Sequence, residues 1–269
     1  MSTCQSQPPG LFHGSGPEGA MRFGPTQTGY LTLVTPSPLA AAHSVSEQVA
    51  EHVAEIVAEV KPRMRGWLHA GTAPLTLVGG VLLVLFSPAG APKVGSAVFA
   101  TCALVLFTVS ATMHHGGWSP RVEKVLTRMD HASIFLLIAG SYTPFSLLLL
   151  TGSDRIVLLC VAWGGATLGI AFRLFVPGAP RWVYTPIYIA LGWAAVFFAG
   201  DFAQYRVTSV VVLLALGGLL YTAGGVVYGL RRPNPVPQWF GFHEVFHTFT
   251  VFAFAAHYAG VSIATYSLR

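Results

Sequence analysis

Charged residues are scarce in this 269-residue chain, at 9% against about 25% in ordinary soluble domains. This shortage excludes an ordinary soluble domain, whose surface carries more charge. The mean hydropathy of +0.61 indicates that the apolar residues form bilayer-length helices rather than one globular core. We therefore expect an all-α membrane protein.

Other features are missing as well. The three cysteines form no CxxC pair and no disulfide framework. The opening run, MSTCQSQPPG, lacks a basic segment followed by an apolar one, so we expect no cleavable signal peptide. The formal charge of +5 is dispersed in short basic clusters between apolar segments. That pattern is typical of cytoplasmic membrane loops and argues against nucleic acid as a partner.

The N-terminal segment differs from the rest of the chain. Residues 1–43 are rich in proline and glycine and predict a disordered cytoplasmic tail. Residues 44–61 predict an amphipathic helix, because Ser44 and Glu47 form a capping box, valines recur at helical spacing, and Pro62 ends the run. We expect this helix to lie on the membrane or under the bundle, with a partner-binding helix as the alternative.

Residues 62–269 contain seven apolar segments that can each cross ~30 Å of hydrocarbon. They predict a seven-transmembrane helix bundle. The segments are 67–86, 94–113, 132–151, 156–172, 182–200, 207–230 and 245–268.

Basic residues favour one side of these spans, with ten on the side of the N-terminus and four on the other. The positive-inside rule then places the N-terminus in the cytoplasm and the C-terminus outside the cell membrane. The ten are Lys61, Arg63, Arg65, Arg121, Lys124, Arg128, Arg173, Arg181, Arg231 and Arg232, and the four are Lys93, Arg155, Arg206 and Arg269.

Polar and ionisable side chains gather where three of the spans begin or end. An ionised group costs ~2.5–3.5 kcal/mol at the centre of a span, so the groups that remain indicate a working site. In a seven-span bundle, the end of the second span and the starts of the third and seventh lie on one side, which the orientation makes the cytoplasmic leaflet. The groups are Ser110 and His114, Asp130 and His131, and His243 and His247.

The histidines among these residues have the spacing of metal ligands. His243 and His247 are four residues apart and therefore face one point, about a turn apart along a helix. Together with His114 they make three ligands with an open fourth position, which is the catalytic form of a zinc site. Asp130 is the expected carboxylate or base for a metal-activated water. Ser110 is expected to hydrogen-bond a ligand or Asp130.

The same run matches the His-Glu-x-x-His motif of zincin metalloproteases, in which the glutamate is the general base. Glu244 lies about 100° around the helix from His243, and no zincin third ligand follows. We therefore expect Glu244 to make a loop-facing or interhelical polar contact. The remaining span histidines are expected to be interfacial or hydrogen-bonded groups outside the metal site, namely His69, His115, His131 and His257.

Three runs resemble the haemolysin III family: SATMHH, MDHASIFLLIAGSYTPF and GFHEVFH. That family is grouped with the progestin and adipoQ receptors and with alkaline ceramidases. The resemblance extends from about residue 61 to the C-terminus. It implies zinc on the three histidines named above, with Asp130 near the metal water and Ser110 beside it.

Three functions fit these features. An open zinc site at lipid depth with a nearby carboxylate favours a zinc-dependent hydrolase of lipid amide or ester bonds, with a membrane lipid as substrate. A receptor or regulator of membrane lipid state with structural zinc is the alternative. A pore-forming haemolysin is the third, although a pore needs polar residues through the full bilayer depth and the outer halves of these spans hold only scattered Thr and Ser.

Overall fold

Helices make up the regular structure of the computed structural model, which describes residues 62–176, 178–204 and 208–267. Within these ranges the only strand-like pairing is an isolated one between Val236 and Phe240. The tail and amphipathic helix expected for residues 1–61 lie outside them. The elements are α2 (Trp67–Phe86), α3 (Ala91–His115), α4 (Pro120–Leu149), α5 (Gly152–Phe175), α6 (Arg181–Gly192), the 3₁₀ helix η1 (Ala194–Phe198), α7 (Ala199–Gln204), α8 (Thr208–Leu230) and α9 (Phe242–Tyr266).

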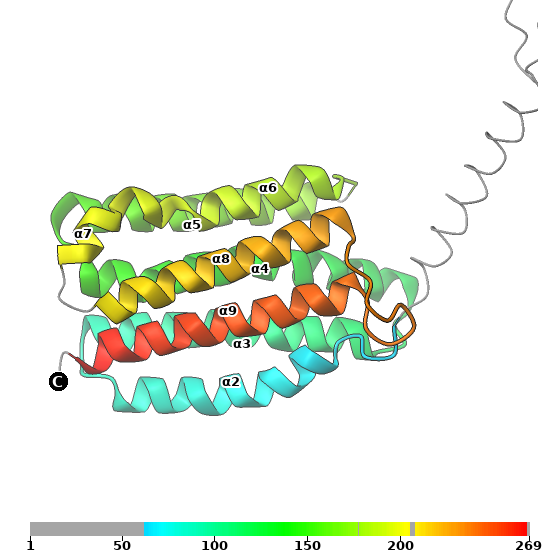
Figure 1. Ribbon diagram of the computed structural model, residues 1–269, viewed down its shortest axis with the longest axis horizontal. Helices are drawn as coiled ribbons and strands as arrows, with labels where there is room; N and C mark the ends of the chain where they lie inside the picture. The colour runs from blue at the N-terminus through cyan, green and yellow to red at the C-terminus, as the bar shows by residue number, and fades with distance from the viewer. Residues whose placement is uncertain (1–61, 177, 205–207, 268–269) are drawn as a thin grey trace, which may run out of the picture. The chain divides into compact units, whose positions relative to one another are not determined.

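The long helices lie side by side in a bundle (Figure 1). Six of them are long and apolar enough to span a membrane, namely α2, α3, α4, α5, α8 and α9. The prediction of an all-α membrane protein is therefore confirmed. The end of α3 and the starts of α2, α4 and α9 lie at the same end of the bundle.

The fifth predicted span is interrupted. Instead of one helix over 182–200, the chain forms the twelve-residue α6 and then passes through Trp193 into η1 and α7. Apolarity predicted a continuous helix, but Pro186 and Gly192 both weaken helical structure. α6 and η1 together still advance about 28 Å at their rises per residue, close to the thickness of the hydrocarbon.

α4 begins earlier than predicted, so the chain between the second and third predicted spans is helical from Pro120 onward. Ser119 precedes the helix and accepts the first backbone hydrogen bond, from Glu123, at 2.9 Å. Proline is favoured at this first position because its missing N–H would have no partner there. Asp130 therefore lies about three turns inside α4 and not at its start.

The core lies around α4, which packs against α3, α5 and α9. Four phenylalanines there have no solvent-exposed surface: Phe99, Phe107, Phe135 and Phe145. α3 and α4 approach closely at Gly140, where a Cβ atom would lie 2.5 Å from the Cβ of Cys102. On the outside, large apolar side chains such as Leu75 and Leu168 are exposed, which suits a surface covered by lipid tails.

Candidate metal centre

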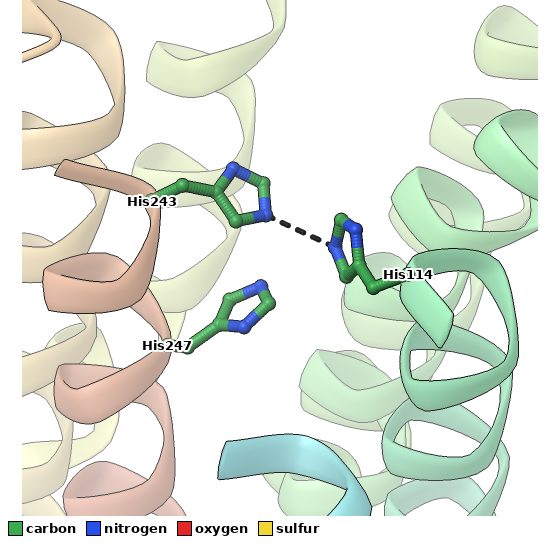
Figure 2. Close-up of side chains that lie close together, drawn as sticks. All are labelled: His114, His243 and His247. Carbon is green, nitrogen blue, oxygen red and sulfur yellow. Dashed lines mark hydrogen bonds between the residues drawn. The ribbon is translucent and has the colours of Figure 1, made fainter. Parts of the chain in front are cut away.

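Three buried imidazoles meet between two helices. His114 lies in the last turn of α3, and His243 and His247 lie in the first two turns of α9. Their exposed fractions are only 6%, 8% and 2%. Figure 2 shows the three rings projecting from the two helices toward one another. The expectation that distant segments bring these histidines together is confirmed.

The spacing of their nitrogens suits one ion. Nε2 of His243 lies 3.1 Å from Nε2 of His114, and the candidate ligand atoms of all three residues lie within 4.8 Å of one another. Nitrogens bound at 2.0–2.1 Å to a tetrahedral zinc ion are about 3.3 Å apart. Nδ1 of His247 is buried with no hydrogen-bond partner among the described residues. This donor set fits a metal ion after small shifts of the rings.

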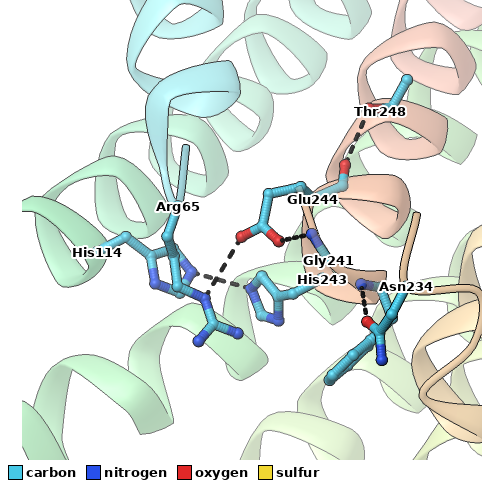
Figure 3. Close-up of polar contacts among 8 residues, drawn as sticks. Arg65, His114, Asn234, Gly241, His243, Glu244 and Thr248 are labelled. Atoms are coloured by element: carbon cyan, nitrogen blue, oxygen red, sulfur yellow. Dashed lines mark hydrogen bonds and ion pairs between the residues drawn. The ribbon is translucent and has the colours of Figure 1, made fainter. Parts of the chain in front are cut away.

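The start of α9 is fixed by Glu244, which is fully buried. One carboxylate oxygen accepts the backbone N–H of Gly241 at 2.8 Å, and the other lies 3.6 Å from Nε of Arg65 (Figure 3). Asn234 accepts the N–H of Phe242 at 2.7 Å. Glu244 thus makes the expected polar contact between segments and holds the turn that carries His243.

Arg65 belongs to the short segment before α2. Burial lowers the pKa of its guanidinium, and the Glu244 carboxylate opposes that shift. The next residue, Gly66, has a φ of 84°, in the left-handed region that favours glycine. A Cβ atom at Gly66 would lie 2.5 Å from the Cβ of His114. Glycine there lets α2 begin directly against the histidine of α3.

Asp130 and Ser110 lie beside the imidazole cluster without belonging to it. Both line the same cavity as His247. The Ser110 hydroxyl is buried and lies near the Asp130 carboxylate, although it makes no hydrogen bond within the described ranges. The three histidines are thus the only described group arranged as metal ligands, and Asp130 can face a molecule held next to them.

The cavity runs inward from this cluster and has a volume of about 200 Å³. Ser110, Asp130 and His247 line one end, and Trp193, Phe202 and His257 line the other. Since His247 and His257 are ten residues apart on α9, these ends are about 15 Å apart. Mainly apolar side chains from α3, α4, α6 and α8 line the length between them.

Comparisons with known proteins agree with these features. The family described as "Haemolysin-III related" matches residues 57–258, which includes every residue of the candidate centre. The chain belongs to the haemolysin III family. It is 30% identical over 189 residues to the hemolysin-3 homolog of Bacillus subtilis, covering 68% of this chain and 84% of that protein.

Two further relatives are similar in sequence to this haemolysin III family member. Hemolysin-3 of Bacillus cereus is 33% identical over 151 residues, which cover 55% of this chain and 69% of that protein. The adiponectin receptor protein of Drosophila melanogaster is 27% identical over 164 residues, which cover 54% of this chain and 36% of that protein. This chain is thus also similar in sequence to a protein named as an adiponectin receptor.

Two other histidines of this haemolysin III family member make hydrogen-bonding contacts outside the cluster, as the sequence predicted. Nδ1 of His131 lies 2.7 Å from the carbonyl oxygen of Thr127, and Nε2 lies 2.9 Å from the hydroxyl of Tyr228. His115 is exposed, and its Nδ1 lies 3.0 Å from the carbonyl oxygen of Ala111. Neither is grouped with the cluster.

His69 is the residue that sequence reasoning missed. It is 2% exposed, and its ring stacks on that of His247 with centroids 3.7 Å apart and planes 14° apart. Both ring nitrogens lack a hydrogen-bond partner among the described residues. A signal was present, because His69 begins the first span and hence lies on the same side as the other histidines. Hydropathy alone cannot show that α2 packs beside α9.

Proposed function

We propose that this protein is a zinc-dependent hydrolase of amide or ester bonds in membrane lipids. The observation that carries the proposal is that His247, a member of the imidazole cluster, and Asp130 line one end of a long apolar cavity. Such a cavity accepts a hydrocarbon chain, whose burial is worth about 0.8 kcal/mol per CH₂ group. A chain lying in it brings its polar end to the histidines.

Each residue then has a separate task. His114, His243 and His247 bind zinc, and the bound ion supplies a Lewis acid that polarises a carbonyl and makes water more acidic. The Asp130 carboxylate orients the attacking water and accepts its proton. The Ser110 hydroxyl, which lies near the Asp130 carboxylate, is available to hydrogen-bond it or the water beside it. The cavity orients the scissile carbonyl by fixing the chain attached to it.

We place this chemistry at the cytoplasmic leaflet of the cell membrane, with the N-terminus in the cytoplasm and the C-terminus outside. The ten-to-four bias of basic residues supports this orientation. The positions of basic residues in the fold support the location of the site. Arg65 pairs with Glu244 beside the cluster, and the guanidinium of Arg181 lies 5.5 Å from the ring of Phe242.

The proposal is tested with Asp130→Asn, which keeps the shape of the side chain but removes its charge. Purified wild type and variant are compared on a panel of ceramides and other acyl lipids, with zinc content measured in parallel. We expect equal zinc and a fall in turnover of about 10²–10⁴-fold, as for a lost general base. If zinc-loaded wild type hydrolyses none of these lipids, the enzyme proposal is wrong.

A second candidate is a receptor or regulator of membrane lipid state in which zinc is structural. Two observations favour it: the near-complete burial of the three imidazoles and the sequence match to a relative named as an adiponectin receptor. In this case zinc joins α3 to α9, and its removal lowers the melting temperature without any turnover to lose. If wild type and Asp130→Asn hydrolyse lipids equally, the protein is still an enzyme but Asp130 takes no part in its mechanism.

A further inference from the structure

The far end of the cavity contains polar atoms that have no partner. At this end, three of the described polar side chains that line the cavity each keep one buried atom without a hydrogen bond: Nδ1 of His257, Oη of Tyr221 and Oγ of Ser141. Leaving such an atom unsatisfied costs about 1–3 kcal/mol. These positions are otherwise surrounded by apolar side chains, so a ligand atom is the expected partner.

The three side chains come from different helices but reach one level of the bundle. The rings of His257 on α9 and Tyr221 on α8 have centroids 5.4 Å apart. His257 fits there because Gly217 has no Cβ, which would collide with the imidazole ring. On α4, Ser141 follows Asp130 by eleven residues, and on α9 His257 follows His247 by ten. Both therefore lie about 15 Å along the bundle from the metal centre.

The hydrogen-bonding roles of this group are complementary to a hydroxyl. Nε2 of His257 lies 3.3 Å from the carbonyl oxygen of Leu214, and a carbonyl can only accept, so this nitrogen carries the proton. In an uncharged imidazole Nδ1 is then a bare acceptor, whereas Tyr221 still has an O–H to donate. One hydroxyl can donate to Nδ1 and accept from Tyr221. A ketone oxygen would leave Nδ1 without a partner, and a methylene group would leave both Nδ1 and the Tyr221 hydroxyl without one.

We infer that the cavity recognises an acyl chain that bears a hydroxyl group at a fixed distance from its polar end, held by His257 and Tyr221 with Ser141 beside them. This inference rests on the proposed function, because it places the polar end of the lipid at the metal centre. An extended chain with C–C bonds of about 1.5 Å advances about 1.25 Å per carbon. About twelve carbons therefore separate the two polar positions.

The test compares two fatty acids that differ by one oxygen: octadecanoate, and octadecanoate with a hydroxyl on its twelfth carbon. Each competes with radiolabelled octadecanoate for the purified full-length protein in lipid nanodiscs. One or two hydrogen bonds predict that wild type binds the hydroxylated acid about three- to tenfold more tightly. Tyr221→Phe and His257→Leu should each reduce this preference toward one, with the preference measured as the ratio of the two affinities within the same variant.

Tyr258→Phe is the matched control. Tyr258 is next to His257 in sequence, but its hydroxyl donates to the carbonyl oxygen of Gly79 at 2.8 Å, and it does not line the cavity. This variant should keep the full preference.

If wild type binds both acids equally, water satisfies the polar atoms and the hydroxyl site is wrong, although a lipid cavity remains. If neither acid binds, the lipid cavity of the proposed function fails and the hydroxyl site fails with it. The wild-type comparison decides without any variant, so a poorly folded mutant cannot obscure the result.

Discussion

Replacement of Glu244 tests whether this residue is structural or is the base of a metalloprotease-like reaction. The carboxylate is fully buried, accepts the N–H of Gly241 at 2.8 Å and lies 3.6 Å from Nε of Arg65. Glu244→Gln keeps an acceptor for the N–H but removes the charge that faces Arg65. Glu244→Ala removes both and leaves the guanidinium without its partner.

The expected losses of stability in the two variants follow from these contacts. The Arg65 side chain is 21% exposed, so solvent partly screens the pair, and we expect Glu244→Gln to lower the free energy of unfolding by about 1–2 kcal/mol. Removing the whole side chain should cost about 3–5 kcal/mol. At about 2–4 °C per kcal/mol, the melting temperature should fall by about 2–8 °C for Gln and about 6–20 °C for Ala.

Thermal unfolding in detergent, with zinc content and lipid turnover measured alongside, checks this reasoning. The Arg65→Gln/Glu244→Gln double variant should lose less stability than the sum of the losses in the two single variants, because both single variants remove the same interaction. Glu123→Gln is the control, since Glu123 is exposed on α4 and its change should stay within about 0.5 kcal/mol. An unchanged melting temperature with abolished turnover in Glu244→Gln would refute the structural role and make Glu244 the base.

Two further predictions concern the surroundings of the site and the orientation of the chain. His69→Ala removes the ring stacked on His247 and should weaken zinc binding by about 10–100-fold, the usual range for residues that orient a ligand. His69→Phe keeps an aromatic ring and should retain most of the affinity, and equal affinity in wild type and His69→Ala would show that stacking does not orient His247. A cysteine placed at Ser119 in a background without native cysteines should resist impermeant thiol reagents added outside intact cells, and its labelling from outside would reverse the proposed topology.

The sequence predicted that the three histidines lie close together because two simple constraints act on them. Helical spacing places His243 and His247 on one face, and the fixed thickness of the bilayer places His114 at their level once the spans are counted. Neither constraint depends on which helices are neighbours in the bundle. The sequence did not reveal the contact of His69 with His247 for that reason, because this contact depends on α2 lying beside α9.

Hydropathy also predicted the wrong helix ends where a helix extends beyond its apolar segment or breaks within one. α4 continues beyond the apolar segment through charged residues that are good helix formers, so its start at Pro120 was not visible in the hydropathy pattern. The break after Gly192 lies inside an apolar run and changes no polarity. The contact between Glu244 and Arg65 joins residues far apart in sequence, and the sequence indicated only that Glu244 needs a polar partner.

The central claim is that His114, His243 and His247 hold one zinc ion, and metal analysis of purified protein tests it most directly. Wild type should contain zinc near one ion per chain after mild chelation, and His247→Ala should lose it because two imidazoles remain. His115→Ala is the matched control, since that exposed histidine adjoins His114 but its ring contacts the carbonyl oxygen of Ala111, Gly66 and Trp67, and it should keep full zinc. Full zinc in His247→Ala under the same chelation would contradict the assignment.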